Sequence, residues 1–163
     1  MEGLELGLTP AGSDVDPQAA LGSQMNLAWF KDSQQLPQPF HVFQSDATHV
    51  SADRLSHPID LIVTEPFLGK PKPDEVQLAG MFRGLEKLYI GAFKQWRTLL
   101  RDKSRVVIVF PRVESPKKVY DLSGLIDKLS TQGYTLLINF GDIRYHRKDA
   151  VVQRDILVFE YHK

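Results

Sequence analysis

Two short apolar runs on either side of a long amphipathic segment limit the possible folds of this chain more than any other feature. The runs, residues 60–64 and 105–110, are rich in β-branched side chains, as is typical of strands buried on both faces. Between them, apolar side chains recur every three or four residues over residues 74–101, which predicts the longest helix. A strand, a crossover helix and a second strand are the unit of parallel sheets. The sequence therefore predicts an α/β fold.

The rest of the chain continues this alternation. A helix is predicted over residues 17–31. Asp16 is a suitable N-cap for it, and Pro17 stands at the first helical position, where proline is favoured. Pro111 is expected to end the strand that begins at residue 105. No helix separates the last two predicted strands, so they should pair antiparallel within a mostly parallel sheet. The other predicted elements are strands at residues 40–43, 135–140 and 156–161, and a helix at 122–132 closed by Gly133.

The composition fits a single domain over residues 1–163. Hydrophobic residues make up 42% of the chain and charged residues 25%, which leaves enough apolar material for a core. Twenty basic and twenty acidic side chains give a formal net charge of zero, so no overall field draws the chain to nucleic acid. An RNA substrate would therefore need a local basic patch or another domain to hold it.

Metal binding and membrane insertion are not expected. The chain has no cysteine, and its five histidines show no repeated ligand spacing. No apolar run approaches the roughly 20 residues of a membrane-spanning helix, and the acidic start is unlike a signal peptide. We therefore expect a cytoplasmic protein.

Acidic residues stand at two places where strands are expected to end and at one where a helix is expected to begin. Glu65 directly follows the run at residues 60–64, Asp46 follows the strand at 40–43, and Asp14 precedes the first long helix. Ligands of open α/β sheets bind beyond the carboxyl ends of the strands, so Glu65 and Asp46 are candidate site residues. An aspartate at such a place also commonly caps a helix, and a Glu-Pro pair can simply end a strand. The order of the three along the chain favours a ligand site more than any one of them does.

Taken together, the motifs GSDVD, FQSDAT and TEPFLG resemble those of class I S-adenosylmethionine-dependent methyltransferases. TEPFLG is most similar to the catalytic motif of the putative RNA methylase family, which includes the tRNA guanine N2-methyltransferases. The resemblance implies a Rossmann-like sheet and S-adenosylmethionine as cofactor. It also implies that Asp14 accepts hydrogen bonds from the ribose hydroxyls and that Asp46 and Ala47 contact the adenine.

The same resemblance implies catalytic roles for Glu65, Pro66 and Phe67, with Leu68 and Gly69 contacting the substrate. An aromatic amine is a weak nucleophile, because the nitrogen lone pair is delocalised into the ring. The Glu65 carboxylate and the Pro66 carbonyl would accept its N–H bonds and orient the nitrogen for in-line attack on the sulfonium methyl group. Phe67 would stack on the base.

Two departures from the family pattern leave the function open. The glycine-rich loop and the strand before it are not found, which implies a domain that is N-terminally incomplete and lacks its first strand. Phe67 and Leu68 stand where the family has proline and tyrosine, so the target atom is open. We therefore keep three functions. The first is methylation of an RNA base, foremost guanine N2 in tRNA, with the RNA held by a separate or missing RNA-binding domain. The second is methylation of DNA adenine or another amine. The third is a non-catalytic, methyltransferase-like binding module.

Two further groups of residues have a structural and a functional interpretation. The one basic concentration is either a solvated loop or an RNA contact, and three aromatic residues at helical apolar positions are expected in the core. The basic residues are Arg144, His146, Arg147, Lys148 and Arg154, and the aromatic ones are Trp29, Tyr89 and Trp96.

Overall fold

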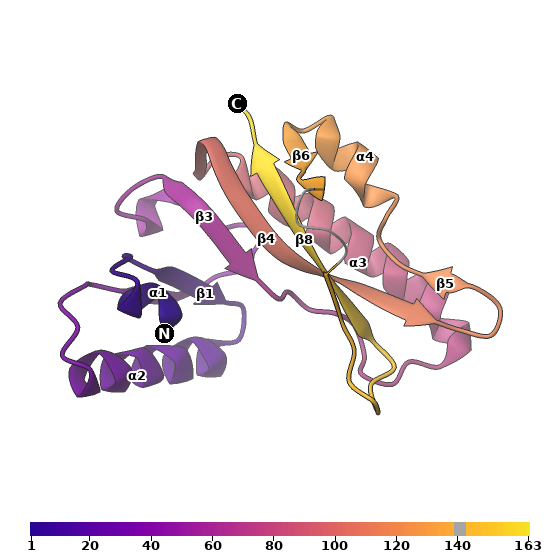
Figure 1. Cartoon of the computed structure of the whole chain (residues 1–163), viewed down its shortest axis with the longest axis horizontal. Helices are drawn as coiled ribbons and strands as arrows, with labels where there is room; N and C mark the ends of the chain where they lie inside the picture. Colours follow the sequence, from indigo (N-terminus) through magenta and orange to yellow (C-terminus); the bar gives the residue numbers. More distant parts are fainter. Residues whose placement is uncertain (139–142) are drawn as a thin grey trace. The chain divides into compact units, whose positions relative to one another are not determined.

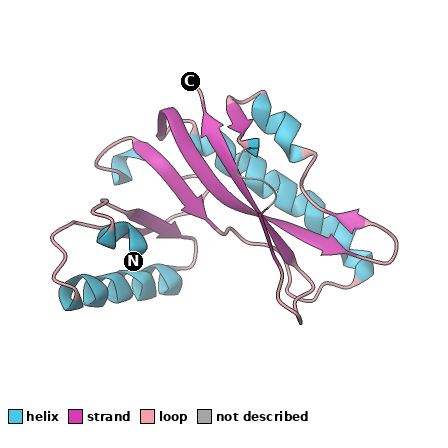
Figure 2. Ribbon diagram, in the orientation of Figure 1, coloured by secondary structure: helices cyan, strands magenta, loops and turns pink. Residues whose placement is uncertain are grey.

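The computed structural model describes residues 1–138 and 143–163, which form both helices and strands (Figures 1 and 2). The chain divides into two compact units, Met1–Ser56 and His57–Lys163. Each unit holds strands of its own sheet together with helices. None of the described helices is long and apolar enough to cross a membrane.

The first unit contains a two-stranded parallel sheet and one long helix. The register of the two strands places Asp14 opposite Gln44. The long helix begins as predicted, because Pro17 is its first residue and the Asp16 side chain accepts a hydrogen bond from the Gln18 N–H at 2.9 Å. The elements of this unit are α1 (Glu2–Glu5), β1 (Ala11–Asp14), α2 (Pro17–Ser33), β2 (His41–Gln44) and the 3₁₀ helix η1 (Ala52–Arg54).

The expectation that Trp29 lies in the core is wrong. Its side chain is 68% exposed, and Met25 and Leu21, one and two turns earlier on α2, are exposed as well. Ala20 is the buried residue of this helix. A helical spacing of apolar residues shows that one face of a helix is apolar, but it does not show that another element covers that face.

The second unit contains a mixed sheet. Its strands lie in the order β3-β4-β8-β6, with β5 added to β4 and β7 to β8. Strands β3 and β4 are parallel, whereas β8 runs antiparallel to β4, β6 and β7. The sheet of this unit is therefore mixed and not mostly parallel as predicted, although the antiparallel last strand is confirmed. The elements are β3 (Ile59–Thr64), α3 (Glu75–Trp96), β4 (Leu100–Glu114), β5 (Val119–Tyr120), α4 (Leu125–Ser130), β6 (Tyr134–Leu136), β7 (Ile143–Tyr145) and β8 (Gln153–Tyr161).

The predicted strand, helix and strand are present as β3, α3 and β4, and α3 lies across one face of the sheet (Figure 1). Two boundaries differ. The helix ends at Trp96 and β4 already begins at Leu100, whereas the helical spacing predicted a helix through residue 101. Pro111 continues β4 opposite Arg154. The ladder between β3 and β4 ends at Ile108, so β3 does not pair with β4 at Pro111. Because no N–H is needed on that side of β4, the proline fits there.

The core of this unit lies between α3 and the sheet. Tyr89 and Trp96 are buried in it, as predicted. Phe93 makes edge contacts with the rings of Tyr134 and Phe159, which come from the two strands β6 and β8. Such packing of aromatic side chains fixes the helix against the sheet.

The segment after α4 also follows the prediction in part. Gly133 has a φ of +91°, and a Cβ there would lie 2.4 Å from the His162 carbonyl oxygen, so glycine is needed. The strand predicted for residues 135–140 is observed as β6, which begins at Tyr134 and ends at Leu136. Residues 139 and 140 of that prediction lie outside the described residues.

Candidate functional site

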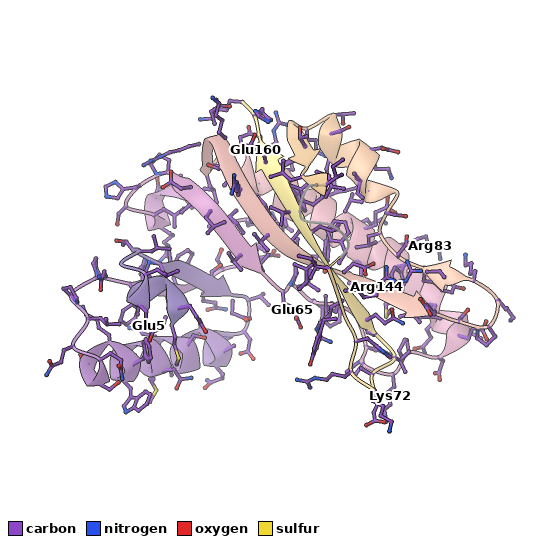
Figure 3. All side chains as sticks on the ribbon, viewed as in Figure 1. Glu5, Glu65, Lys72, Arg83, Arg144 and Glu160 are labelled. Atoms are coloured by element: carbon purple, nitrogen blue, oxygen red, sulfur yellow. The ribbon has the colours of Figure 1, made fainter. Side chains whose placement is uncertain are left out.

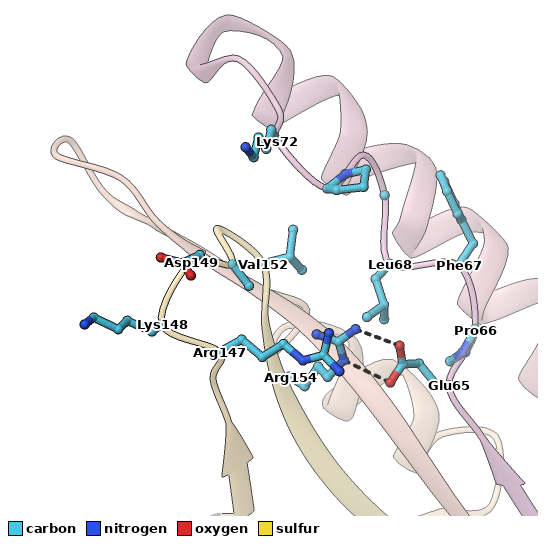
Figure 4. Close-up of a pocket in the computed structure, with 13 residues that line it drawn as sticks. Glu65, Pro66, Phe67, Leu68, Lys72, Arg147, Lys148, Asp149, Val152 and Arg154 are labelled. Atoms are coloured by element: carbon cyan, nitrogen blue, oxygen red, sulfur yellow. Dashed lines mark hydrogen bonds and ion pairs between the residues drawn. The ribbon is translucent and has the colours of Figure 1, made fainter.

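The side chain of Glu65 is held by Arg154 at the end of β3. The Arg154 Nε and Nη2 atoms donate hydrogen bonds to the two carboxylate oxygens, each at 2.9 Å (Figure 4). Both side chains are partly exposed, Glu65 at 46% and Arg154 at 26%. The hydrogen bonds to Glu65 raise the pKa of Arg154 above its ordinary value. This bidentate geometry fixes the plane of the carboxylate and leaves further lone pairs on both oxygens for a ligand.

The segment after Glu65 is held in place by contacts with α3 and β4. Leu68 is buried, and Gly69 has a φ of +93°. The Tyr89 hydroxyl donates a hydrogen bond to the Val109 carbonyl at 3.1 Å and lies 3.4 Å from the Phe67 carbonyl. Burial, and to a smaller extent the charge of Glu65, raise the pKa of Tyr89 well above its ordinary value, which keeps the hydroxyl a donor. The backbone beside Glu65 is thus anchored to α3 and β4.

A cavity of about 650 Å³ opens beside this segment. One side is formed by residues 65–69 with Pro71 and Lys72, and the other by residues 147–150 with Val152 and Arg154. The second side belongs to the hairpin of β7 and β8, whose tip lies near Lys72 in Figure 3. A volume of this size is within the usual range of about 300–1,000 Å³ for small-molecule sites.

Phe67 lies at the border of two cavities. Its side chain is 64% exposed and points away from the Glu65 carboxylate in Figure 4. It also lines a second, largely apolar cavity of about 570 Å³, together with Met81 and Leu88 of α3. The predicted stacking of Phe67 on a base next to Glu65 remains a prediction.

The predicted cofactor residues lie in the first unit. Asp14 and Asp46 stand at the carboxyl ends of β1 and β2, and the Ser45 N–H donates a hydrogen bond to the Asp14 carbonyl at 2.9 Å. One Asp14 carboxylate oxygen accepts the Asp16 N–H at 2.9 Å. The Thr48 N–H and hydroxyl donate to Asp46 at 2.7 and 2.8 Å, which holds the pKa of Asp46 below its ordinary value. The structure therefore brings these two aspartates to the same end of the sheet, at the carboxyl ends of its strands.

The predicted site residues fall into two sets. Ala47, predicted to contact the adenine with Asp46, is half-buried in the turn after β2. Asp14, Asp46 and Ala47 belong to the first unit, whereas Glu65 to Gly69 belong to the second. Among the described residues, no group of three or more His, Cys, Asp or Glu side chains suits a metal ion.

Sequence reasoning missed the partnership of Arg154 with Glu65. The two residues are 89 positions apart, and the pairing of β4 with both β3 and β8 brings them together. In the sequence, Arg154 belongs to the basic concentration, but the members of this group have different partners in the structure. Arg144 pairs with Asp155 at 2.5 Å, while Arg147 and Lys148 line the cavity. A basic residue just before the strand predicted at residues 156–161 was the one available signal.

The fold is that of class I S-adenosylmethionine-dependent methyltransferases, as the comparison with solved structures shows. The chain is similar to TrmN from Thermus thermophilus, with a TM-score of 0.51 and 18% identity over 94% of this chain and 36% of that one. An rRNA methylase from Streptococcus thermophilus matches with a TM-score of 0.51 and 13% identity, over 96% of this chain and 76% of that one.

A third similar structure is that of a small-molecule methyltransferase. It is the 1,6-didemethyltoxoflavin-N1-methyltransferase of Burkholderia thailandensis with bound S-adenosylhomocysteine, at a TM-score of 0.56 and 11% identity over 99% of this chain and 75% of that one. No protein-family model matches the chain, and no curated protein matches its sequence. The predicted absence of a first strand and of a glycine-rich loop stays a prediction.

Proposed function

We propose that this chain is an S-adenosylmethionine-dependent methyltransferase domain that acts on the exocyclic amine of a base in RNA, with guanine N2 of tRNA as the first expected target. One observation carries the proposal. The Glu65 carboxylate is held in a fixed orientation at the carboxyl end of β3, beside a cavity that can contain a base. The methyltransferase fold supports the reaction type, and the likeness to an rRNA methylase supports an RNA substrate.

The carboxyl ends of β1 and β2 suit the proposed cofactor. One oxygen of Asp14 is used by the Asp16 N–H, and the other accepts no hydrogen bond from the described residues. A carboxylate offers only acceptors, which fits the hydroxyl donors of a ribose, and Asp46 would face the adenine amine in the same way. When bound, S-adenosylmethionine would supply an electrophilic methyl group.

The residues of the second unit would prepare the nitrogen. Glu65 and the Pro66 carbonyl accept the two N–H bonds of the amine, which raises electron density on the nitrogen and aligns its lone pair. Arg154 acts through Glu65, because its two hydrogen bonds keep the carboxylate in one plane. In this proposal Glu65 would also accept the proton that the nitrogen loses after methylation.

A non-catalytic binding module is the second candidate, and the same ion pair favours it. Both Glu65 oxygens already accept hydrogen bonds from Arg154, as in a purely structural salt bridge. The two candidates differ in one measurable property, which is methyl transfer.

The test is transfer of a radiolabelled methyl group from S-adenosylmethionine to bulk tRNA by the full chain. We expect transfer by the wild-type chain and its loss in Glu65→Ala, because the amine loses an acceptor, while cofactor affinity stays nearly unchanged. Nucleoside analysis of the product would identify the base. A folded wild-type chain that binds S-adenosylmethionine and methylates neither RNA nor DNA would support the binding module instead.

A further inference from the structure

We propose that Lys72, Arg147 and Lys148, here called the basic rim, bind the phosphodiester backbone of a single-stranded nucleic acid whose base enters the cavity beside Glu65. This inference rests on the proposed function, since it names the surface that would hold the substrate. It decides between the two interpretations of Arg147 and Lys148 that the sequence left open, adds Lys72 to them, and names the part of the nucleic acid that they bind.

The basic rim is assembled by the fold from two distant segments. Lys72 belongs to the loop between β3 and α3, and Arg147 and Lys148 belong to the loop between β7 and β8. The Ala150 N–H donates a hydrogen bond to the Arg147 carbonyl at 3.0 Å, which closes a turn at the tip of the hairpin. All three side chains line the same cavity as Glu65 (Figure 4).

The charges of the cavity favour an anion. Its lining carries four cationic side chains, those of the basic rim and Arg154, against the two carboxylates of Glu65 and Asp149. This local excess of two positive charges occurs in a chain with a formal net charge of zero. Arg154 is paired with Glu65, whereas the three side chains of the basic rim are exposed and form no ion pair with the described residues.

Exposed cations that form no ion pair with the described residues, around a base-sized cavity, match the layout of a nucleic-acid site. Phosphate contacts position the chain without reading its sequence, while the cavity receives the base. A polynucleotide can contact several cations at once, whereas a mononucleotide offers a single phosphate. Affinity should therefore depend on polymer length and on salt.

The experiment measures fluorescence anisotropy of a short, fluorescein-labelled single-stranded RNA with the full chain, without S-adenosylmethionine, over a series of salt concentrations. The test variant combines Lys72→Gln, Arg147→Gln and Lys148→Gln. Each phosphate contact to a single strand contributes about 0.7 to the salt slope, so three lost contacts should lower the slope by about 2 and weaken binding by about 100-fold at 0.1 M salt. Single-stranded DNA should respond in the same way, because its backbone carries the same phosphates.

The matched control combines Lys87→Gln, Lys94→Gln and Lys103→Gln. These three lysines are also exposed and form no ion pair with the described residues, but they lie outside the cavity lining. Both variants lose three positive charges, but the control keeps the basic rim and should therefore keep nearly the wild-type slope. Thermal melts of all three proteins check that the substitutions leave the fold intact.

The inference is overturned if wild-type chain does not bind the RNA, or if both variants weaken binding equally. It is also overturned if guanosine monophosphate displaces the RNA at the concentration at which an unlabelled oligonucleotide does, since the site would then be one for free nucleotides. Because no cofactor is present, the result is independent of methyl transfer. Salt-dependent binding through the basic rim without any transfer would contradict the proposed function alone.

Discussion

At the scale of single residues, the ion pair of Glu65 and Arg154 matters more for geometry than for stability. Both side chains are partly exposed, and pairs of this kind typically contribute about 0–1 kcal/mol to folding. The fork of an arginine, however, fixes the plane of a carboxylate in a way that a lysine does not. Arg154 is therefore a positioning residue in the proposed reaction.

The variant Arg154→Lys separates these two effects. It keeps the positive charge but loses the bidentate geometry, so we expect a clear fall in kcat for methyl transfer with little change in KM. The free energy of unfolding should change by about 1 kcal/mol or less. Steady-state kinetics and urea denaturation measure the two quantities. A wild-type kcat in this variant would show that the orientation of Glu65 by Arg154 is not needed.

Residue contacts of this kind were the least predictable feature of the chain. The acidic end of β3 could be found from the sequence, because an apolar run ends there at Glu65. Its partner could not, because the contact depends on the strand register across 89 residues. Local patterns carry no information on such a register.

At the scale of elements, the segment between β3 and α3 depends on Gly69. Its φ of +93° is rarely adopted by other residues, and a Cβ there would lie 2.5 Å from the Met81 Sδ atom. The flexible Met81 side chain can relieve part of this contact, but the backbone strain would remain. Gly69 therefore shapes the wall of the cavity through the backbone.

We expect Gly69→Ala to lower the free energy of unfolding by about 1–3 kcal/mol, because alanine is strained at this φ. Gly84→Ala is the matched control. Gly84 lies within α3, and a Cβ there meets nothing within 4 Å, so alanine should stabilise the helix by about 0.5–1 kcal/mol. Urea denaturation of both variants provides the comparison. An unchanged or raised stability of Gly69→Ala would contradict this account of the loop.

Element types were more predictable from the sequence than element ends. The strand, helix and strand from β3 to β4 follow from apolar periodicity. The end of α3 was misplaced because Leu99 and Leu100 continue the helical spacing although β4 begins at Leu100. Pro111 was misread because a proline ends a strand only where its N–H is required by a neighbouring strand.

At the scale of the whole molecule, the proposed activity needs both units. The aspartates expected to bind the cofactor lie in Met1–Ser56, and the acidic segment expected to hold the amine lies in His57–Lys163. The fold class could be predicted from the sequence, but this division and the mixed sheet could not, since both depend on how strands pair. Experiments on function therefore require the full chain.

The measurement that tests the central claim most directly is calorimetric titration of S-adenosylmethionine into the full chain, after circular dichroism has shown that it is folded. We expect micromolar binding, and we expect Asp14→Ala to raise Kd by about 10- to 100-fold through the partial loss of two charge-assisted hydrogen bonds. Binding unchanged in Asp14→Ala would leave Asp14 a purely local role with the Asp16 N–H. A folded wild-type chain that does not bind S-adenosylmethionine would contradict the methyltransferase assignment itself.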